Sequence, residues 1–215
     1  MIADYRGLFR SMSGRIGDFI VYNHRNRICV RSYPTNVKAP CTPGQLAQQA
    51  RVASIAVFYH ALKEAGVYEY WKKAAEGMTQ SGYNLLVRCN LPAFDGEGRI
   101  GDFSKLQLSQ GKVRQLSGLN LEEGTDGEWR LTWNGSIQWQ FARKDDVVKL
   151  YVMEDGGEEF DVEPIETGEC RRGDGECVFR LPERCKDFPH LYVLVCSRTD
   201  GQCSSSRYFL LTHKF

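Results

Sequence analysis

The chain of 215 residues lacks any long apolar run, and its N-terminus lacks a secretory pattern. No stretch approaches the roughly 18 consecutive apolar residues that a membrane-spanning helix needs. The opening run MIADYRGLFRSMSGRIG has no apolar central region of the kind found in signal peptides. These absences predict a soluble chain with no membrane partner, and we expect it in the cytoplasm.

The motifs of common enzyme classes are also missing. There is no G-x-S-x-G, no H-E-x-x-H and no G-x₄-G-K-[ST], and the four histidines are scattered. The adjacent carboxylates Asp145-Asp146 and Glu158-Glu159 would face opposite ways in a strand, so we interpret them as solvated turn residues. We therefore predict that the chain is not an enzyme, and we expect no cofactor and no small-molecule substrate.

Cysteines are numerous, but the spacing of a zinc site is absent. The chain has 8 cysteines and no C-x₂₋₄-C pair. The nearest set has gaps that fit no compact zinc knuckle: Cys170, Cys177, Cys185 and His190. Without an export signal, we predict no metal site and free, mostly buried thiols.

Two cysteine pairs depend on where a turn lies. A two-residue turn at Asp200-Gly201 would place Cys203 opposite Arg198, so that Cys196 and Cys203 should not bond without a slip in the strand register. A turn at Gly173-Asp174 would place Cys170 directly opposite Cys177, whereas a turn at Asp174-Gly175 would place Arg172 there. The sequence leaves these two alternatives open.

Charge is divided unevenly along the chain. Residues 1–115 hold 16 Lys and Arg against 8 Asp and Glu, and residues 116–215 hold 12 against 19, which gives net charges of +8 and −7. The hydrophobic periodicity changes at the same place: the helical pattern ends there, and the period-two alternation typical of strands begins. We therefore predict a basic domain at residues 1–117 and an acidic domain at residues 118–215, with the boundary near Ser117 to Leu119.

A β-hairpin is predicted in the basic half. FIVY at Phe19 to Tyr22 and RICVRSY at Arg27 to Tyr33 flank a polar turn of residues 23–26. Because side chains alternate along a strand, Ile28 and Val30 should point to one face and Arg27, Cys29, Arg31 and Tyr33 to the other. The candidate nucleic-acid-binding residues on the hairpin and the following helix start are Arg25, Arg27, Arg31, Tyr33, Lys38 and Arg51.

Helices should follow the hairpin. Thr42-Pro43-Gly44-Gln45 is typical of a helix start with a capping box, and the helix should run to about Ala65 and stop at Gly66. Its apolar positions predict core packing: Leu46, Ala50, Ala53, Ile55, Val57, Phe58 and Leu62. Further helical segments are predicted around residues 70–73 and 81–90.

This region resembles a known family. The run RSYPTNVKAPCTPGQLAQQARV, with GRIGDFIVY before it and SGYNLLVRCNL and DFSKLQLSQG after it, is similar to an uncharacterised bacterial domain-of-unknown-function family found mainly in gut anaerobes. The matching positions are Arg31, Ser32, Pro34, Pro40, Thr42 and Gln45. Ala39 and Gln49 depart from the family pattern, which usually has Asn and a basic residue there. The resemblance covers residues 14–111 and implies an organisation without a known activity.

The sequence pattern of the acidic half predicts an all-β module. Trp129, Leu131 and Trp133 alternate on one face, and strand-like runs recur to the end of the chain, at 137–141, 147–153, 160–165, 177–181, 191–196 and 208–212. Short strands at this spacing are typical of an immunoglobulin-like or fibronectin-III-like sandwich. The fold class is therefore α+β, a hairpin-and-helix module followed by a β-sandwich.

The hexapeptide GRIGDF occurs twice, at Gly14 to Phe19 and at Gly98 to Phe103, and the second copy completes the dinucleotide-loop pattern G-x-G-x-x-G. A dinucleotide loop needs a buried strand before it and a helix after it. Here LPAFD precedes the pattern and the strand-like DFSKLQLS follows it. We interpret both copies as glycine turns that lead into a strand.

Two functional hypotheses remain. The first is a non-enzymatic scaffold or binding protein that works through protein-protein contacts, either with a partner protein or by self-assembly. The alternative is nucleic-acid binding through the basic hairpin and helix start, because 8 basic residues in the first 60 face only Asp4 and Asp18. The charge division is compatible with either one.

Overall fold

The structure is a computed structural model that describes residues 13–24, 27–36, 42–124, 127–136, 141–154 and 159–212. The chain divides into two compact units, Met1–Cys41 and Thr42–Phe215. Over the described ranges, no helix has the length and apolar character needed to cross a bilayer.

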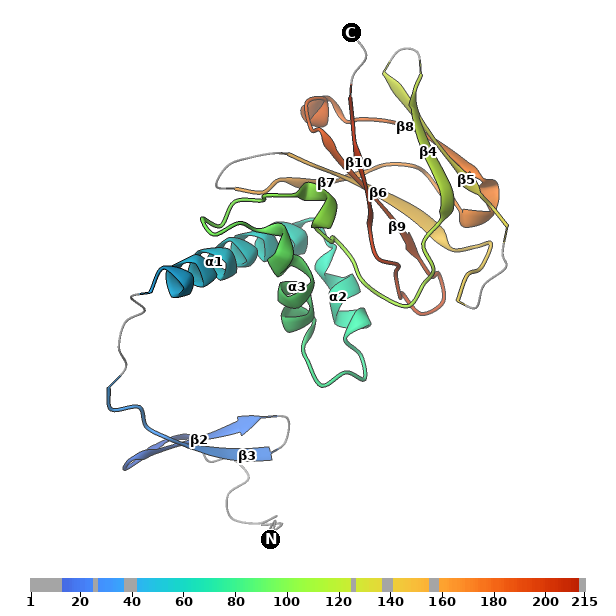
Figure 1. Cartoon of the computed structure of the whole chain (residues 1–215). Coiled ribbons are helices and arrows are strands. Elements are labelled where there is room, and N and C mark those ends of the chain that lie inside the picture. The colour runs from blue at the N-terminus through green and yellow to red at the C-terminus, as the bar shows by residue number, and fades with distance from the viewer. Residues whose placement is uncertain are drawn as a thin grey trace. The chain divides into compact units, whose positions relative to one another are not determined.

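The first unit is a three-stranded antiparallel sheet in the order β1-β2-β3 (Figure 1). Its strands are β1 (Gly14–Ile16), β2 (Phe19–His24) and β3 (Arg27–Ser32). The predicted hairpin is confirmed, although β2 continues through Asn23 and His24, which were expected in the turn, until His24 pairs with Arg27. The first GRIGDF copy supplies β1 and its turn, where Gly14 and Gly17 have φ of 134° and 57°.

The second unit begins with three helices: α1 (Pro43–Glu64), α2 (Tyr68–Ala74) and α3 (Gly82–Asn90). The capping box at the start of α1 is confirmed, because the Thr42 side chain accepts from the Gln45 N–H while the Gln45 side chain accepts from the Thr42 N–H. The helix ends before Gly66, which has a φ of 72°. These local signals fix both ends of α1 as predicted.

Two antiparallel sheets follow the helices. The four-stranded sheet has the order β10-β9-β6-β7, and the three-stranded sheet has the order β4-β5-β8. Their strands are β4 (Ser117–Glu123), β5 (Glu128–Asn134), β6 (Val147–Met153), β7 (Val162–Ile165), β8 (Glu176–Arg180), β9 (His190–Cys196) and β10 (Arg207–Leu210). The predicted α+β class is confirmed as a mixture of helices and antiparallel sheets.

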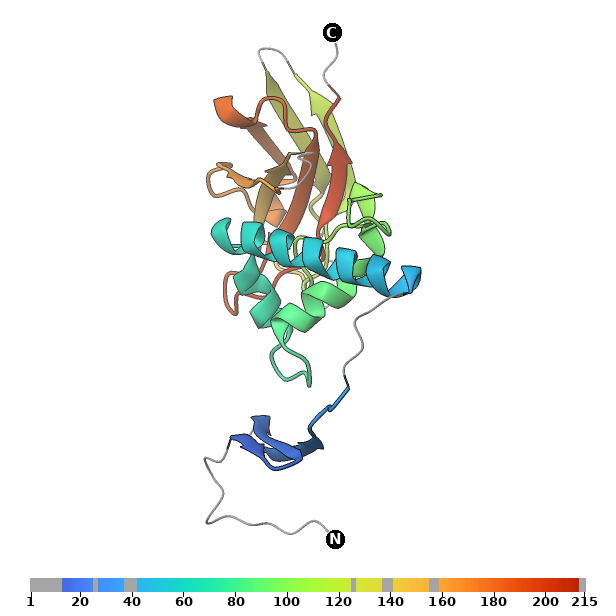
Figure 2. The same cartoon turned by 90° about the vertical axis from the view of Figure 1, so that its left-hand side faces the viewer.

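The four-stranded sheet lies between two hydrophobic cores. Tyr151 and Tyr192 belong to the core shared with the helices, whereas Leu150 and Val193 belong to the core shared with the three-stranded sheet. This alternation along β6 and β9 means that both faces of these strands are covered. Figure 2 shows the three helices grouped together beside the strands.

The division into units differs from the one expected near Ser117. The segment that precedes β4 is bonded to the end of the chain: Leu108 N–H donates to Ser206 Oγ at 3.0 Å, and Ser109 Oγ donates to the Ser204 carbonyl at 2.8 Å. Because the helices also share a core with β6 and β9, they form one compact unit with the two sheets. The charge composition changes near Ser117, but the residues before and after this position pack into the same compact unit.

The prediction that Cys196 and Cys203 remain unbonded is wrong, since a disulfide joins them. The Ser197 N–H donates to the Gln202 carbonyl at 2.7 Å, so the connection between them spans residues 198–201 rather than two residues. This longer connection brings Cys196 directly opposite Cys203. The other described cysteines have free thiols: Cys29, Cys89, Cys170, Cys177 and Cys185.

Two further expectations about burial need correction. Asp146 is not a solvated turn residue, because its side chain is 2% exposed and forms an ion pair with Arg172 at 3.1 Å. On α1, Ile55, Phe58 and Leu62 are buried as expected, but Leu46 and Val57 are exposed. Periodicity identified the apolar positions of α1 without showing how far the protein core extends along the helix.

Candidate functional site

Strand register separates the side chains of the β1-β2-β3 sheet into two unlike faces. Directly paired residues share a face, and successive residues alternate. The basic face, as we name it, comprises Arg15, Ile20, Tyr22, His24, Arg27, Cys29 and Arg31. The apolar face comprises Ile16, Phe19, Val21, Asn23, Ile28, Val30 and Ser32.

On the basic face, Arg15 reaches the end of the sheet. Its guanidinium lies 3.7 Å from the centroid of the Tyr33 ring, which is a cation–π geometry, and its Nε donates to the Gly17 carbonyl. The backbone N–H of Tyr33 donates to the Asp18 carbonyl at 2.6 Å. A cation and an aromatic ring therefore lie side by side at one end of this sheet.

The structure brings together three of the sequence-predicted residues, Arg27, Arg31 and Tyr33, and adds Arg15 to them. Sequence reasoning missed Arg15 because only the pairing of β1 with β2 shows its face. Arg25 and Lys38 lie outside the described residues.

Arg51 belongs to the other compact unit, where its Nε donates to the Asp95 carbonyl at 3.0 Å. This contact holds the 95–99 turn against α1. The structure therefore gives Arg51 a packing role within the second unit.

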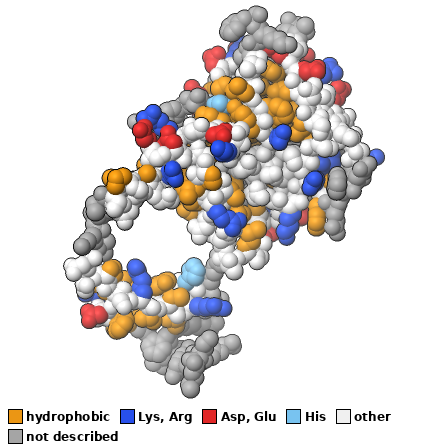
Figure 3. All heavy atoms as spheres, viewed as in Figure 1, with side chains coloured by type: hydrophobic (Ala, Val, Ile, Leu, Met, Phe, Trp, Pro, Cys, Tyr) orange, Lys and Arg blue, Asp and Glu red, His pale blue; other side chains and the backbone are white. Residues whose placement is uncertain are grey.

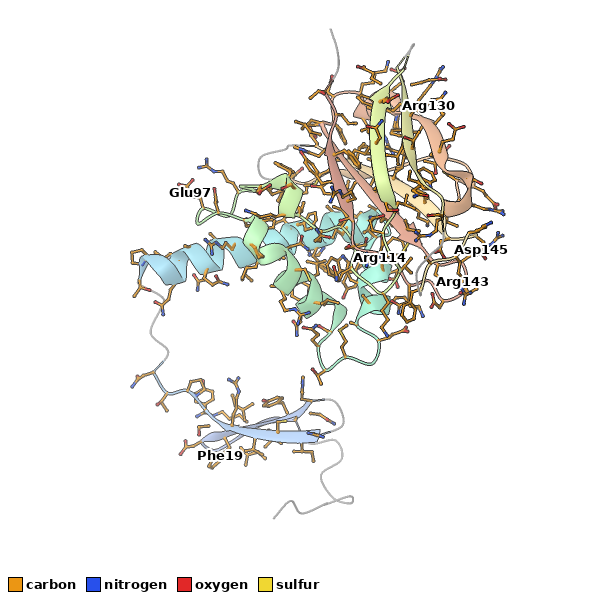
Figure 4. All side chains as sticks on the ribbon, turned by 45° about the vertical axis from the view of Figure 1, so that its right-hand side comes forward. Phe19, Glu97, Arg114, Arg130, Arg143 and Asp145 are labelled. Carbon is orange, nitrogen blue, oxygen red and sulfur yellow. A yellow bond between two sulfur atoms is a disulfide. The ribbon has the colours of Figure 1, made fainter. Side chains whose placement is uncertain are left out.

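The apolar face is open over the part of this unit that the structure describes. Phe19 is 54% exposed and Val30 is 61% exposed, and none of the described residues of the unit is buried. Figure 3 shows hydrophobic and basic side chains on the surface of this sheet, and Figure 4 labels Phe19 there. An exposed cluster of large apolar side chains is typical of a contact surface.

The second GRIGDF copy forms a turn packed on α1. A Cβ added at Gly98 would lie 2.5 Å from Ser54 Oγ and 2.9 Å from the Ala50 carbonyl oxygen, so the close approach requires glycine. Backbone N–H groups of Arg99 and Glu97 donate to the Asp95 carboxylate and lower its pKa below the ordinary value. The predicted strand after this turn is wrong, because residues 103–105 form a 3₁₀ helix capped by Asp102.

A hollow in the second unit has a volume of about 770 Å³ and lies beside the segment of residues 111–119. Its described lining includes Lys112, Arg114 and Arg207 and contains no histidine and no carboxylate. Figure 4 labels Arg114. Across the described ranges, no cluster of three or more His, Cys, Asp or Glu is arranged to hold a metal ion.

Comparison with known proteins adds no relative: no protein-family model, no curated protein and no solved structure matches the chain. The two faces of the β1-β2-β3 sheet are therefore the features from which a function can be argued.

Proposed function

We propose that this chain is a non-enzymatic assembly protein whose β1-β2-β3 sheet contacts protein through its apolar face. The observation that carries the proposal is the exposure of Ile16, Phe19, Ile28 and Val30 on one face of a sheet that buries none of its described residues. Small sheets of this kind normally need a hydrophobic face packed against another layer for stability. A protein surface that covers this face would supply such a layer.

The charge distribution supports the same proposal. Arg15, Arg27 and Arg31 all lie on the basic face, so a partner can cover the apolar face without removing an arginine from water. Burial of apolar area contributes about 25 cal/mol per Å². The apolar face can therefore drive association while the basic face stays solvated.

We also propose that the two packed sheets of the second unit form a sandwich of immunoglobulin or fibronectin type III character. If β4 to β10 are named A to G in chain order, one sheet is A-B-E and the other is G-F-C-D. The immunoglobulin constant-type sandwich has A, B, E and D in one sheet and C, F and G in the other, so only the fourth strand changes sheets. An experimental structure with a different strand order would contradict this proposal.

Two matched double variants of β3 test the assembly function. Ile28→Glu with Val30→Glu places two carboxylates on the apolar face, whereas Arg27→Glu with Arg31→Glu places two on the basic face of the same strand. In light scattering over a range of concentrations, we expect a wild-type mass above the monomer, which the first double variant lowers and the second retains. A monomeric wild type at every concentration would contradict self-assembly.

Nucleic-acid binding is the second candidate function, and the register of the sheet favours it. Pairing places Arg15, Arg27 and Arg31 on one face together with Tyr22, and Tyr33 lies beneath Arg15. Arginines bind phosphates, and aromatic rings stack on bases. The basic face thus combines both kinds of group that a single-stranded nucleic acid requires.

The same variants test this second candidate with the opposite outcome. In fluorescence anisotropy with labelled single-stranded DNA and RNA at two salt concentrations, binding should fall with salt and be lost in the Arg27→Glu, Arg31→Glu variant. The Ile28→Glu, Val30→Glu variant should still bind. Equal affinity of all three proteins would remove the sheet as the binding surface.

A further inference from the structure

Cys170 and Cys177 lie at the two ends of a turn between the packed sheets of the second unit. Cys177 is in β8 and pairs with Leu131 of β5, which places it in the three-stranded sheet. The Cys170 carbonyl accepts from the N–H of Val148 in β6, a strand of the four-stranded sheet, at 2.9 Å. Both side chains are buried in the core between the sheets.

The turn that separates these cysteines is held in place by several contacts. It consists of a 3₁₀ helix, Arg172–Asp174, followed by Gly175 with a φ of 77°. The Trp133 ring N–H donates to the Arg172 carbonyl at 2.7 Å, and the Gly173 N–H donates to the Lys144 carbonyl at 3.0 Å. These contacts hold the backbone of the turn in place while both cysteines are free thiols.

The two thiols are neighbours in the core between the sheets. The Cys170 Sγ donates to the Glu176 carbonyl oxygen at 3.5 Å, and Glu176 immediately precedes Cys177. Each thiol is the main cause of the other's shift, which raises the pKa of Cys170 and lowers the pKa of Cys177. Since the thiolate is the nucleophile in disulfide exchange, Cys177 is the sulfur prepared to react first.

We propose that Cys170 and Cys177 are a modification site at which a small-molecule disulfide oxidises the pair to a second intramolecular disulfide. The Cys177 thiolate attacks one sulfur of the small disulfide and breaks its S–S bond, and the released thiolate takes up the proton lost by Cys177. Cys170 then loses its proton and attacks the Cys177 sulfur of the mixed disulfide, which expels the second small thiol. Two protein thiols and one small disulfide become one protein disulfide and two small thiols.

The other cysteines of the second unit can be compared with Cys170 and Cys177. Cys196 and Cys203 already form a disulfide, so the fold of this unit accommodates one intramolecular disulfide. Cys185 is fully buried in the same core as Cys170 and Cys177, but the groups that shift its pKa after burial are Glu163, Arg184 and Asp161, with no cysteine among them. Burial is therefore shared by all three thiols, and a neighbouring thiol distinguishes Cys170 and Cys177.

Trypsin provides a direct test, because Arg171 and Arg172 lie between the two cysteines. The full chain is incubated with oxidised glutathione, its remaining thiols are alkylated in denaturant without reduction, and the digest is analysed by mass spectrometry. We expect the peptide containing Cys170 to be joined to the peptide of residues 173–180, while Cys185 is alkylated. Cleavage at Arg198 also separates Cys196 from Cys203, so their joined peptides report the existing disulfide in the same digest.

The variant Cys177→Ser serves as the control. It should leave Cys170 alkylated and unlinked after the same treatment, whereas Cys185→Ser should leave the Cys170–Cys177 link intact. Recovery of Cys170 and Cys177 as separately alkylated or separately glutathionylated peptides from the oxidised wild-type chain would overturn the proposal. Because the decisive result comes from the wild-type chain, it does not depend on the folding of a variant.

Discussion

Two three-stranded antiparallel sheets of this protein share the same alternation and differ in what covers them. In β4-β5-β8, Leu131 of the central strand β5 is fully buried, whereas in β1-β2-β3, Val30 of the edge strand β3 is 61% exposed. The outer face of β4-β5-β8 carries the ion pairs Arg130–Glu176 and Arg180–Glu128. On the basic face of β1-β2-β3, Arg27 and Arg31 have no ion-pair partner among the described residues.

This difference shows that alternation determines which side chains share a face but does not determine what lies against that face. The cover of β4-β5-β8 comes from β6 and β9, which are distant in the sequence. The first unit has no such layer among its own described residues. The proposed assembly function would supply such a layer from another molecule.

The largest change in stability is expected from removing a buried charge in the second unit. Asp146→Ala removes the carboxylate that pairs with Arg172 and also accepts from the Arg143 N–H at 2.8 Å. Loss of one partner leaves the buried guanidinium uncompensated, and we expect a cost of about 3–5 kcal/mol in the free energy of unfolding. All four tryptophans lie in residues 42–215, so tryptophan fluorescence during urea unfolding measures this unit.

Glu176→Ala is the matched control for that experiment. It removes a carboxylate from the exposed pair with Arg130, and exposed ion pairs contribute only about 0–1 kcal/mol. Similar costs for the two variants would mean that burial of the Asp146–Arg172 pair does not govern its contribution.

The next effect compares the two sheets directly. Leu131→Ala deletes a fully buried side chain between the sheets and should cost about 2–5 kcal/mol in the same urea experiment. Val30→Ala removes an exposed side chain and should change the unfolding of residues 42–215 by less than about 0.5 kcal/mol. A large decrease in the free energy of unfolding of residues 42–215 in Val30→Ala would contradict the assignment of the two sheets to separate compact units.

Sequence reasoning succeeded where the signal is local. The start of α1 depends on Thr42, Pro43 and Gln45, which are neighbours in sequence, and the faces of β3 follow from alternation alone. These features need no information about distant segments, so one sequence is sufficient to place them.

The features that sequence reasoning missed depend on contacts between distant segments or on the length of a connection. Arg15 is assigned to the basic face only by the pairing of β1 with β2, and Asp146 is buried in a pair with Arg172, which lies 26 residues further along the chain. The Cys196–Cys203 bond depended on how far the connection before Cys203 extends. In each case the local sequence is compatible with more than one partner, and the partner is determined only by the tertiary structure.

A smaller effect separates the two copies of GRIGDF. Gly98→Ala combines a positive φ with a clash against the Ala50 carbonyl, so we expect a loss above the roughly 1–2 kcal/mol of left-handed strain. At Gly17, with a φ of 57°, an added Cβ meets nothing within 4 Å, so only the strain applies, and it falls on the first unit. Urea unfolding followed by tryptophan fluorescence should detect Gly98→Ala and not Gly17→Ala. Equal shifts would mean that the packing of Gly98 on α1 is unimportant.

The smallest expected effect concerns Thr42, the first residue of the second unit. Thr42→Ala removes the hydroxyl that accepts from the Gln45 N–H, which is the side-chain half of the Thr42 cap, and should lower the stability of residues 42–215 by about 1 kcal/mol in the urea experiment. Thr42→Ser retains a hydroxyl that can accept from the Gln45 N–H and should restore most of the loss. Because the cap acts on α1 and the proposed assembly surface is the apolar face of β1-β2-β3, the mass of Thr42→Ala in light scattering should equal that of the wild type. A lower mass would show that assembly depends on the second unit and would move the search for the contact from the sheet to α1, where Leu46 and Val57 are also exposed.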